Sequence, residues 1–248
     1  MNKKEENSSK RIELRINHGD NMNNNKLYKF ALISAVISTI GWVAYIVGAT
    51  GTPDLSAAET GQQFFQAMLA AKSTYLIYGW GGVFGALLSI PYVIAFYEAV
   101  KTAGSIRLVV VASAVIGAVM TAIGFLSNTI SVAYFMLPDA IEAGAEQLDM
   151  MRIALNFATD ASEGVWWVGS FLLYGIGTWM FAWYALKHTS TAKWINYVGL
   201  VGGLSGIIWL RHFLPFLKPL ILPLSLVNIL AISIWSIAFS VSSIRSEE

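Results

Sequence analysis

Six stretches of the sequence are long and apolar enough to cross a lipid bilayer as α-helices. A helix needs about 20 mostly apolar residues to span the roughly 30 Å hydrocarbon layer. Of the 248 residues, 56% are apolar and only 12% are charged, whereas about a quarter of the residues in a soluble domain are charged. We therefore predict an all-α, polytopic membrane protein with six transmembrane helices in an antiparallel bundle. The stretches are Phe30–Ala49, Thr74–Val100, Leu108–Leu137, Gly164–Leu186, Trp194–Leu214 and Leu220–Ser243.

The positions of lysine and arginine predict how this bundle is oriented. Basic residues near the ends of membrane helices are retained on the cytoplasmic side. Seven of the 16 lysines and arginines precede Phe30, two lie in each of the second-to-third and fourth-to-fifth connections, and one follows the last span. The remaining four lie on the other side. We expect a protein of the cell membrane with both termini in the cytoplasm, and an even number of spans independently requires the termini to share a side.

Segments outside the apolar stretches predict a tail and two small helices. Residues 1–29 are polar, include the run NMNNN and lack helical periodicity, which is typical of disorder. We expect a disordered cytoplasmic tail before a transmembrane domain of residues 30–245. In the external connections, residues 56–73 and 146–160, apolar residues recur at helical spacing. They are expected to form two short external helices; the alternative is that they prolong the neighbouring spans.

Two glycine motifs share the spacing GG-x-x-G in the second and fifth stretches. The first contains Gly81 and Gly85, and the second contains Gly202 and Gly206. Small residues four apart let helix backbones approach closely in a membrane, where lipid gives no hydrophobic drive for helix pairing. Helix packing is therefore their predicted role. The alternative is an inverted repeat of the transporter kind, because the two motifs share their spacing and each is followed by a proline, at Pro91 and Pro215.

The fifth apolar stretch contains two adjacent ionisable residues, Arg211 and His212. Counting from the cytoplasmic boundary at 1.5 Å per residue places Arg211 about 26 Å along its helix, near the outer edge of the hydrocarbon layer. Polar residues at such depth usually face the interior of the bundle and mark sites or pathways. We hypothesise an outward-facing vestibule for a small-molecule ligand. Its candidate residues are Asn128, Asp160, Glu163, Arg211, His212 and Asn228.

Structural roles are the alternative for these residues. Arg211 can form an ion pair at the outer rim with the acidic connection from Pro138 to Gly164. Asp160 and Glu163 match a helix-start signature, which the positive end of the helix dipole favours. The tandem Trp166–Trp167 that follows is expected to anchor the helix at the membrane interface.

The composition excludes several activities. The absence of cysteine rules out disulfides, thiolate metal sites and thiol nucleophiles, and a net charge of +1 gives no basic field for nucleic acid. An intramembrane serine protease needs a histidine within hydrogen-bond reach of its serine, normally from another helix. Downstream of Ser205 the sequence offers only His212, about 10 Å further along the same helix. We therefore expect no catalytic residue, metal site or cofactor.

A non-enzymatic role in binding, sensing or assembly within the bilayer is the leading functional prediction, and the chain is compatible with a homo-oligomer. The alternative is a small-molecule transporter or permease that uses the vestibule, and an intramembrane enzyme is a distant third. Transport is disfavoured because the cytoplasmic half offers mainly Glu98, which Lys101 can neutralise from one turn away.

Three segments carry a resemblance to a known family. They are WYALKHTSTAKWINYVGLVGGLSGIIWL, LPLSLVNILAISIWSIAFSV and GGVFGALLSIPYVIAFYEAVK. Their glycine spacing, basic turns and proline-introduced last helix resemble the bacterial integral membrane family called domain of unknown function 4386, over roughly Phe30 to Arg245. The resemblance implies a polytopic helical membrane domain. It implies no activity and no catalytic residue.

Overall fold

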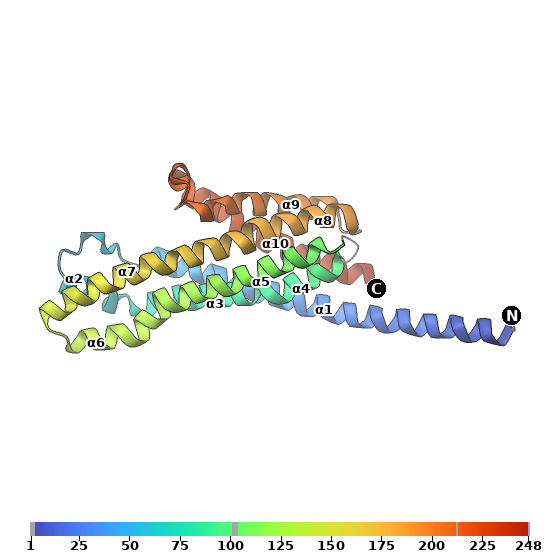
Figure 1. Ribbon diagram of the computed structural model, residues 1–248, viewed down its shortest axis with the longest axis horizontal. Coiled ribbons are helices and arrows are strands. Elements are labelled where there is room, and N and C mark those ends of the chain that lie inside the picture. Colours follow the sequence, from blue (N-terminus) through green and yellow to red (C-terminus); the bar gives the residue numbers. More distant parts are fainter. Residues whose placement is uncertain (1–2, 101–103, 212, 248) are drawn as a thin grey trace.

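The computed structural model describes residues 3–100, 104–211 and 213–247, with side chains between residues 25 and 246 of these ranges. This part of the chain is helical and contains no strand. Figure 1 shows its helices side by side along one long axis, with several joined end to end into columns. The elements are α1 (Lys3–Gly51), η1 (Leu55–Ala57), α2 (Gly61–Ala70), α3 (Lys72–Leu87), α4 (Ser89–Ala99), α5 (Ile106–Phe125), the π-helical η3 (Leu126–Ile130) and η4 (Val132–Met136), α6 (Leu137–Glu142), α7 (Ala145–Ser170), the π-helical η5 (Phe171–Gly177), α8 (Thr178–His188), α9 (Lys193–Ser205), the 3-10 helices η6 (Gly206–Leu210) and η7 (Pro215–Leu220), and α10 (Ile221–Glu247).

Several of these columns are membrane helices. Within the described ranges, five helical stretches are long and apolar enough to cross a bilayer. The protein is therefore a polytopic helical membrane protein. The predicted span Trp194–Leu214 is not among the five; in this region α9 ends at Ser205 and the chain continues as the short 3-10 helix η6. The five are Asn25–Ala57, Lys72–Ala99, Ile106–Glu142, Ala145–His188 and Pro215–Ser246.

The first membrane helix begins earlier than the sequence predicts. Disorder was expected up to residue 29, but α1 is assigned from Lys3, and residues 1–24 lie outside the described side chains. Tyr28 is only 6% exposed and Leu27 packs against the same core. The prediction is therefore wrong for residues 25–29, because this apolar pair gives the end of the predicted tail a face to bury.

The two predicted external helices have different outcomes. Residues 56–73 contain a separate helix, α2, which begins with a capping box: the Thr60 side chain accepts from the Gln63 backbone, and the Gln63 side chain accepts from the Thr60 backbone. Residues 146–160 are instead the first part of α7, which runs without a break into the next span. A separate second helix was therefore the wrong expectation, and prolongation of the span is what the structure has.

The bundle is longer than a bilayer is thick. The column from Ala145 to His188 has 44 residues, or about 66 Å at 1.5 Å per residue, about twice the hydrocarbon thickness. We call the end of the bundle that holds the C-terminus the terminal end. Helices α2 and α6 lie at the opposite end, which we call the far end (Figure 1). A second apolar cluster holds α2, α6 and the start of α7 together there. Its buried members are Phe64, Phe65, Met68, Val132, Leu137, Ala140, Leu148 and Leu155.

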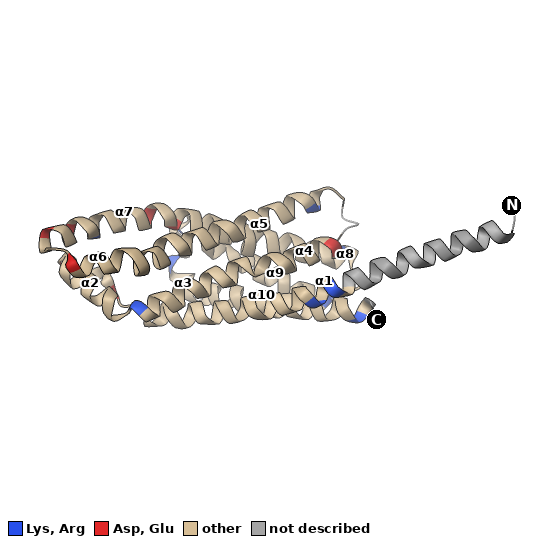
Figure 2. Ribbon diagram, turned by 90° about the horizontal axis from the view of Figure 1, so that it is seen from below, with Lys and Arg blue, Asp and Glu red and all other residues tan. Residues whose placement is uncertain are grey.

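Most described basic residues lie at the terminal end and most acidic residues lie towards the far end, with exceptions such as Glu98 in α4 and Lys72 at the start of α3 (Figure 2). Basic residues gather at the terminal end, on α1, the start of α5, the end of α8, the start of α9 and the end of α10. These are Lys26, Lys29, Arg107, Lys187, Lys193 and Arg245. Acidic residues lie on α6 and α7 towards the far end. These are Asp139, Glu142, Glu146, Asp149, Asp160 and Glu163.

Both GG-x-x-G motifs lie where helices touch backbone to backbone. A Cβ on Gly81 would lie 2.5 Å from the backbone nitrogen of Tyr45 in α1, and one on Gly85 would lie 2.7 Å from the Trp42 ring. A Cβ on Gly202 would lie 3.0 Å from Ile232 of α10, and one on Gly206 would lie 2.5 Å from the Tyr174 carbonyl oxygen. These distances are too short for a side chain at three of the four positions, so the glycines set the helix spacing.

Candidate ligand pocket

A pocket of about 340 Å³ opens near the far end of the bundle. This volume falls within the range of small-molecule sites, about 300–1,000 Å³. Helices α1, α3, α5 and α7, the π-helical η3, and the turn after η6 each contribute to its lining. We call it the far-end pocket. Its lining residues are Tyr45, Ala49, Thr52, Tyr75, Tyr78, Gly124, Phe125, Asn128, Thr129, Thr159, Glu163, Trp166, Trp167 and Arg211.

The charged residues of the far-end pocket meet on one tryptophan ring. The guanidinium carbon of Arg211 lies 3.2 Å from the ring centroid of Trp167, and the Trp167 Nε1–H donates to Glu163 Oε2 at 3.5 Å. An aromatic ring is negative on its face and positive at its edge, so a cation on the face and a carboxylate at the N–H edge are both favourable. Arg211 also interacts electrostatically with Glu163. This arrangement takes the place of the direct rim ion pair that the sequence suggested for Arg211.

Asn128 enters the far-end pocket from a π-helical turn. Its Oδ1 accepts a hydrogen bond from the Ser162 hydroxyl, which links η3 to α7 beside Glu163. Turns of π-helix inside α-helices are frequent at functional sites. Asn128 lines the pocket, and its amide N–H₂ has no acceptor among the described residues.

Aromatic rings make up the walls of the far-end pocket. The Tyr45 and Tyr78 rings lie 5.0 Å apart between centroids, and each meets Phe125 at 5.5 Å in edge-to-face geometry. Trp166 meets Phe125 at 5.1 Å. Its buried Nε1–H has no hydrogen-bond partner in the described part of the chain. The pocket therefore combines flat apolar walls with an unused buried donor.

A layer of rings closes the far-end pocket towards the terminal end. We define this aromatic layer as Trp42, Phe125, Trp166, Trp167 and Trp209. Within it, Trp209 lies 6.1 Å from Trp166 and 5.7 Å from Trp167, and Trp42 lies 6.3 Å from Phe125, all between centroids. Phe125 and the tandem tryptophans line the far-end pocket, whereas Trp42 and Trp209 line a second space behind it. The layer thus separates the two spaces.

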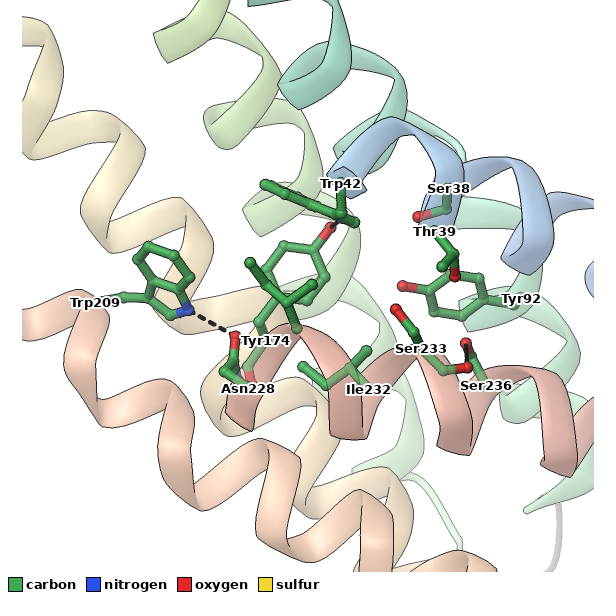
Figure 3. Close-up of a pocket in the computed structure, with 11 residues that line it drawn as sticks. Ser38, Thr39, Trp42, Tyr92, Tyr174, Trp209, Asn228, Ile232, Ser233 and Ser236 are labelled. Atoms are coloured by element: carbon green, nitrogen blue, oxygen red, sulfur yellow. Dashed lines mark hydrogen bonds between the residues drawn. The ribbon is translucent and has the colours of Figure 1, made fainter. Parts of the chain in front are cut away.

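The space behind the aromatic layer is a small cavity, which we call the inner cavity (Figure 3). Its volume is about 10 Å³, which is room for about one water molecule. Hydroxyl side chains reach it from α1, α4 and α10. Its lining residues are Ser38, Thr39, Trp42, Tyr92, Tyr174, Trp209, Asn228, Ile229, Ile232, Ser233 and Ser236.

Asn228 belongs to this inner cavity and makes hydrogen bonds with all its polar atoms. Its Nδ2 donates to the Gly202 carbonyl at 2.7 Å and to the Tyr174 carbonyl at 3.1 Å. Its Oδ1 accepts from Trp209 Nε1 at 2.9 Å, the bond drawn in Figure 3. The residue is 1% exposed. It therefore ties α10 to α9, η5 and η6 as a structural group.

The structure brings together three of the six predicted vestibule residues. Asn128, Glu163 and Arg211 line the far-end pocket. Asp160 is exposed and outside the lining, Asn228 lies behind the aromatic layer, and His212 lies outside the described residues.

The aromatic residues of the far-end pocket were not predicted from the sequence. Tyr45 and Tyr78 lie within apolar stretches, where nothing in the pattern separates them from lipid-facing residues. The tandem tryptophans, expected as interface anchors, are 7% and 1% exposed and line the pocket instead. Their position three and four residues after Glu163 was the one available signal.

No group of three or more His, Cys, Asp or Glu able to hold a metal ion occurs in the searched residues, those that the structure describes. The hydroxyl of Ser205, the serine considered above as a nucleophile, is buried and donates to the Gly202 carbonyl of its own helix at 2.7 Å. Such a bond to the carbonyl of the preceding turn is a local side-chain contact of serine within a helix.

Comparison with known proteins gives one match. The family model described as domain of unknown function (DUF4386) matches residues 32–241. No curated protein and no solved structure matches the chain. The matched range covers the far-end pocket, the aromatic layer and the inner cavity.

Proposed function

Because the chain belongs to the DUF4386 family, which brings no assigned activity, we propose a function from the pocket itself. The protein is a non-enzymatic, six-span membrane protein that binds a small organic molecule in the far-end pocket, on the external side of the cell membrane. The observation that carries this proposal is the pocket of about 340 Å³ in which Arg211 lies against aromatic walls.

A sixth crossing is supported by the length and direction of α9 and η6. The C-terminal end of α8 lies at the terminal end, and α10 returns there, so the chain between them must run outward and back (Figure 1). From Lys193 to Leu210 the α-helix and the more extended 3-10 helix cover about 30 Å, the thickness of the hydrocarbon layer. Because a 3-10 helix rises more per residue than an α-helix, this short segment is long enough to cross the hydrocarbon layer.

The charge separation supports cytoplasmic termini, and site-directed labelling tests them. The chain has no cysteine, so single cysteines can be labelled without background. We expect a membrane-impermeant maleimide to label Lys218→Cys in η7 on intact cells, and Ser190→Cys between α8 and α9 only after permeabilisation. Both positions are exposed, so burial does not explain a difference. If only Ser190→Cys were labelled on intact cells, the termini would be external and the proposed orientation would be wrong. If both were labelled, α9 and η6 would not cross the membrane.

Closure of the far-end pocket supports binding rather than transport. The aromatic layer lies directly below the pocket, and the inner cavity behind it has room for about one water molecule. A transport cycle would need this layer to open. Binding needs only the pocket that is already formed.

A pocket-filling variant tests the binding function. Ala49 lines the far-end pocket, and Val47 on the same helix is 59% exposed on the outside of the bundle. Among small organic molecules screened with the purified protein, we expect a subset to raise the Tm. Ala49→Trp should abolish that increase because the indole occupies the pocket, whereas Val47→Trp should retain it. The proposal is overturned if no stabilising compound is sensitive to Ala49→Trp.

A further inference from the structure

Three hydrogen-bond donors of the far-end pocket have no acceptor assigned to them. The buried Trp166 Nε1–H is unpaired within the described chain. The Arg211 guanidinium has its face on the Trp167 ring, and no hydrogen bond from its N–H groups is present among the described residues. The Asn128 side-chain oxygen accepts from the Ser162 hydroxyl. Its N–H₂ group has no acceptor among the described residues. The Trp166 donor is buried, and a buried donor without an acceptor is costly. The Arg211 and Asn128 donors belong to the pocket lining, so a ligand that supplies acceptor oxygens can pair with them.

The charges of the lining limit how negative this ligand can be. Arg211 and Glu163 are the charged residues of the described lining, and their formal charges cancel. A single carboxylate gains a charge-assisted, two-point contact with the guanidinium edge. A second negative charge would have no further cation in this lining and would be repelled by Glu163.

The shape of the lining indicates the rest of the ligand. Tyr45, Tyr78 and Phe125 form a continuous edge-to-face cluster, and Trp166 extends it. Rings of this kind favour offset or edge-to-face contact with another ring. Resting on the proposed binding function, we propose that the far-end pocket takes an aromatic monocarboxylate, with its carboxylate on Arg211 and Trp166 and its ring among the tyrosines.

Matched probes test this ligand class on the full-length purified protein. The probes are phenylacetate, its neutral amide phenylacetamide, and phenyl phosphate as the dianion. We expect phenylacetate to raise the Tm at millimolar concentration and to bind at least about tenfold more tightly than either other probe, the factor that a charge-assisted hydrogen bond supplies. Equal or tighter binding of the amide or the phosphate would overturn the ligand class.

Three variants assign the carboxylate contact. Arg211→Gln should weaken phenylacetate binding by about tenfold or more and leave phenylacetamide unchanged. Trp166→Phe keeps the ring, removes the N–H donor and should weaken phenylacetate severalfold. Lys218→Gln removes a nearby exposed cation and should change neither. Unchanged phenylacetate binding by Arg211→Gln, or an equal loss in Lys218→Gln, would overturn the assignment.

Failure of the ligand class and failure of the binding function give different results. If another compound stabilises the protein and Ala49→Trp abolishes that effect, while phenylacetate does nothing, the far-end pocket binds a ligand and the aromatic monocarboxylate is wrong. If no compound is sensitive to Ala49→Trp, both proposals are wrong.

Discussion

Replacing Gly81 with alanine is expected to destabilise the folded protein by about 2–3 kcal/mol or more, the upper range for overpacking a well-packed interior. The added Cβ would lie 2.5 Å from the Tyr45 backbone nitrogen and 2.8 Å from the Gly41 carbonyl oxygen. Neither backbone atom can rotate away, so α1 and α3 must move apart. That movement would also separate Gly48 from Tyr78, two residues that meet on the same pair of helices.

A glycine with open space beside it provides the control for Gly81→Ala. Gly164 lies in α7, and a Cβ built on it meets nothing within 4 Å. Alanine is favoured over glycine inside a helix by about 0.5–1 kcal/mol, so Gly164→Ala should be neutral or slightly stabilising. Both variants are compared with the wild type by thermal unfolding in the same detergent. Equal losses in the two variants would show that helix spacing at Gly81 is not the cause.

The sequence predicts the membrane class because apolar length is a strong local signal. Stretches such as Leu108–Leu137 need no knowledge of their neighbours to be identified as spans, and the structure has a span from Ile106 to Glu142 there. The same approach misplaced the start of α7. Residues 146–160 are too acidic to resemble a span, but no glycine or proline interrupts the chain between Ala145 and Gly164, so nothing ends the helix between the two.

The sequence predicts how deep the candidate site residues lie in the membrane, but not which way their side chains face. Counting residues at 1.5 Å places Arg211 and Asn128 at a similar depth, and both line the far-end pocket. Which way a side chain faces depends on helix rotation, and the π-helical turns η3 and η5 shift that rotation away from the regular helical period. Asn228 in α10 shows that depth alone does not decide the direction: it faces carbonyl groups of η5 and α9 instead of the pocket.

The largest effect at the inner cavity is expected from Asn228→Leu. Leucine has a similar volume but leaves the Trp209 Nε1–H and the Gly202 and Tyr174 carbonyl groups without their partner. Each buried polar group left unsatisfied costs about 1–3 kcal/mol, and hydrogen bonds between membrane helices average somewhat less. We expect the folded state to lose about 2–4 kcal/mol, measured by thermal or denaturant unfolding in detergent.

A second buried asparagine, Asn196, provides a control that distinguishes the loss of hydrogen bonds from the loss of a buried side chain. Asn196 is 0% exposed, but its Oδ1 accepts one long bond from Trp235 Nε1 at 3.4 Å, and its Nδ2 has no partner among the described residues. Asn196→Leu removes an amide that was already poorly satisfied, so it should cost well under half of the Asn228→Leu loss. If both variants lose the same stability, then filling the buried volume rather than hydrogen bonding governs these positions. The hydrogen bonds of Asn228 would then not hold α10 against α9 and η5, and the helices around the inner cavity would be held by packing alone.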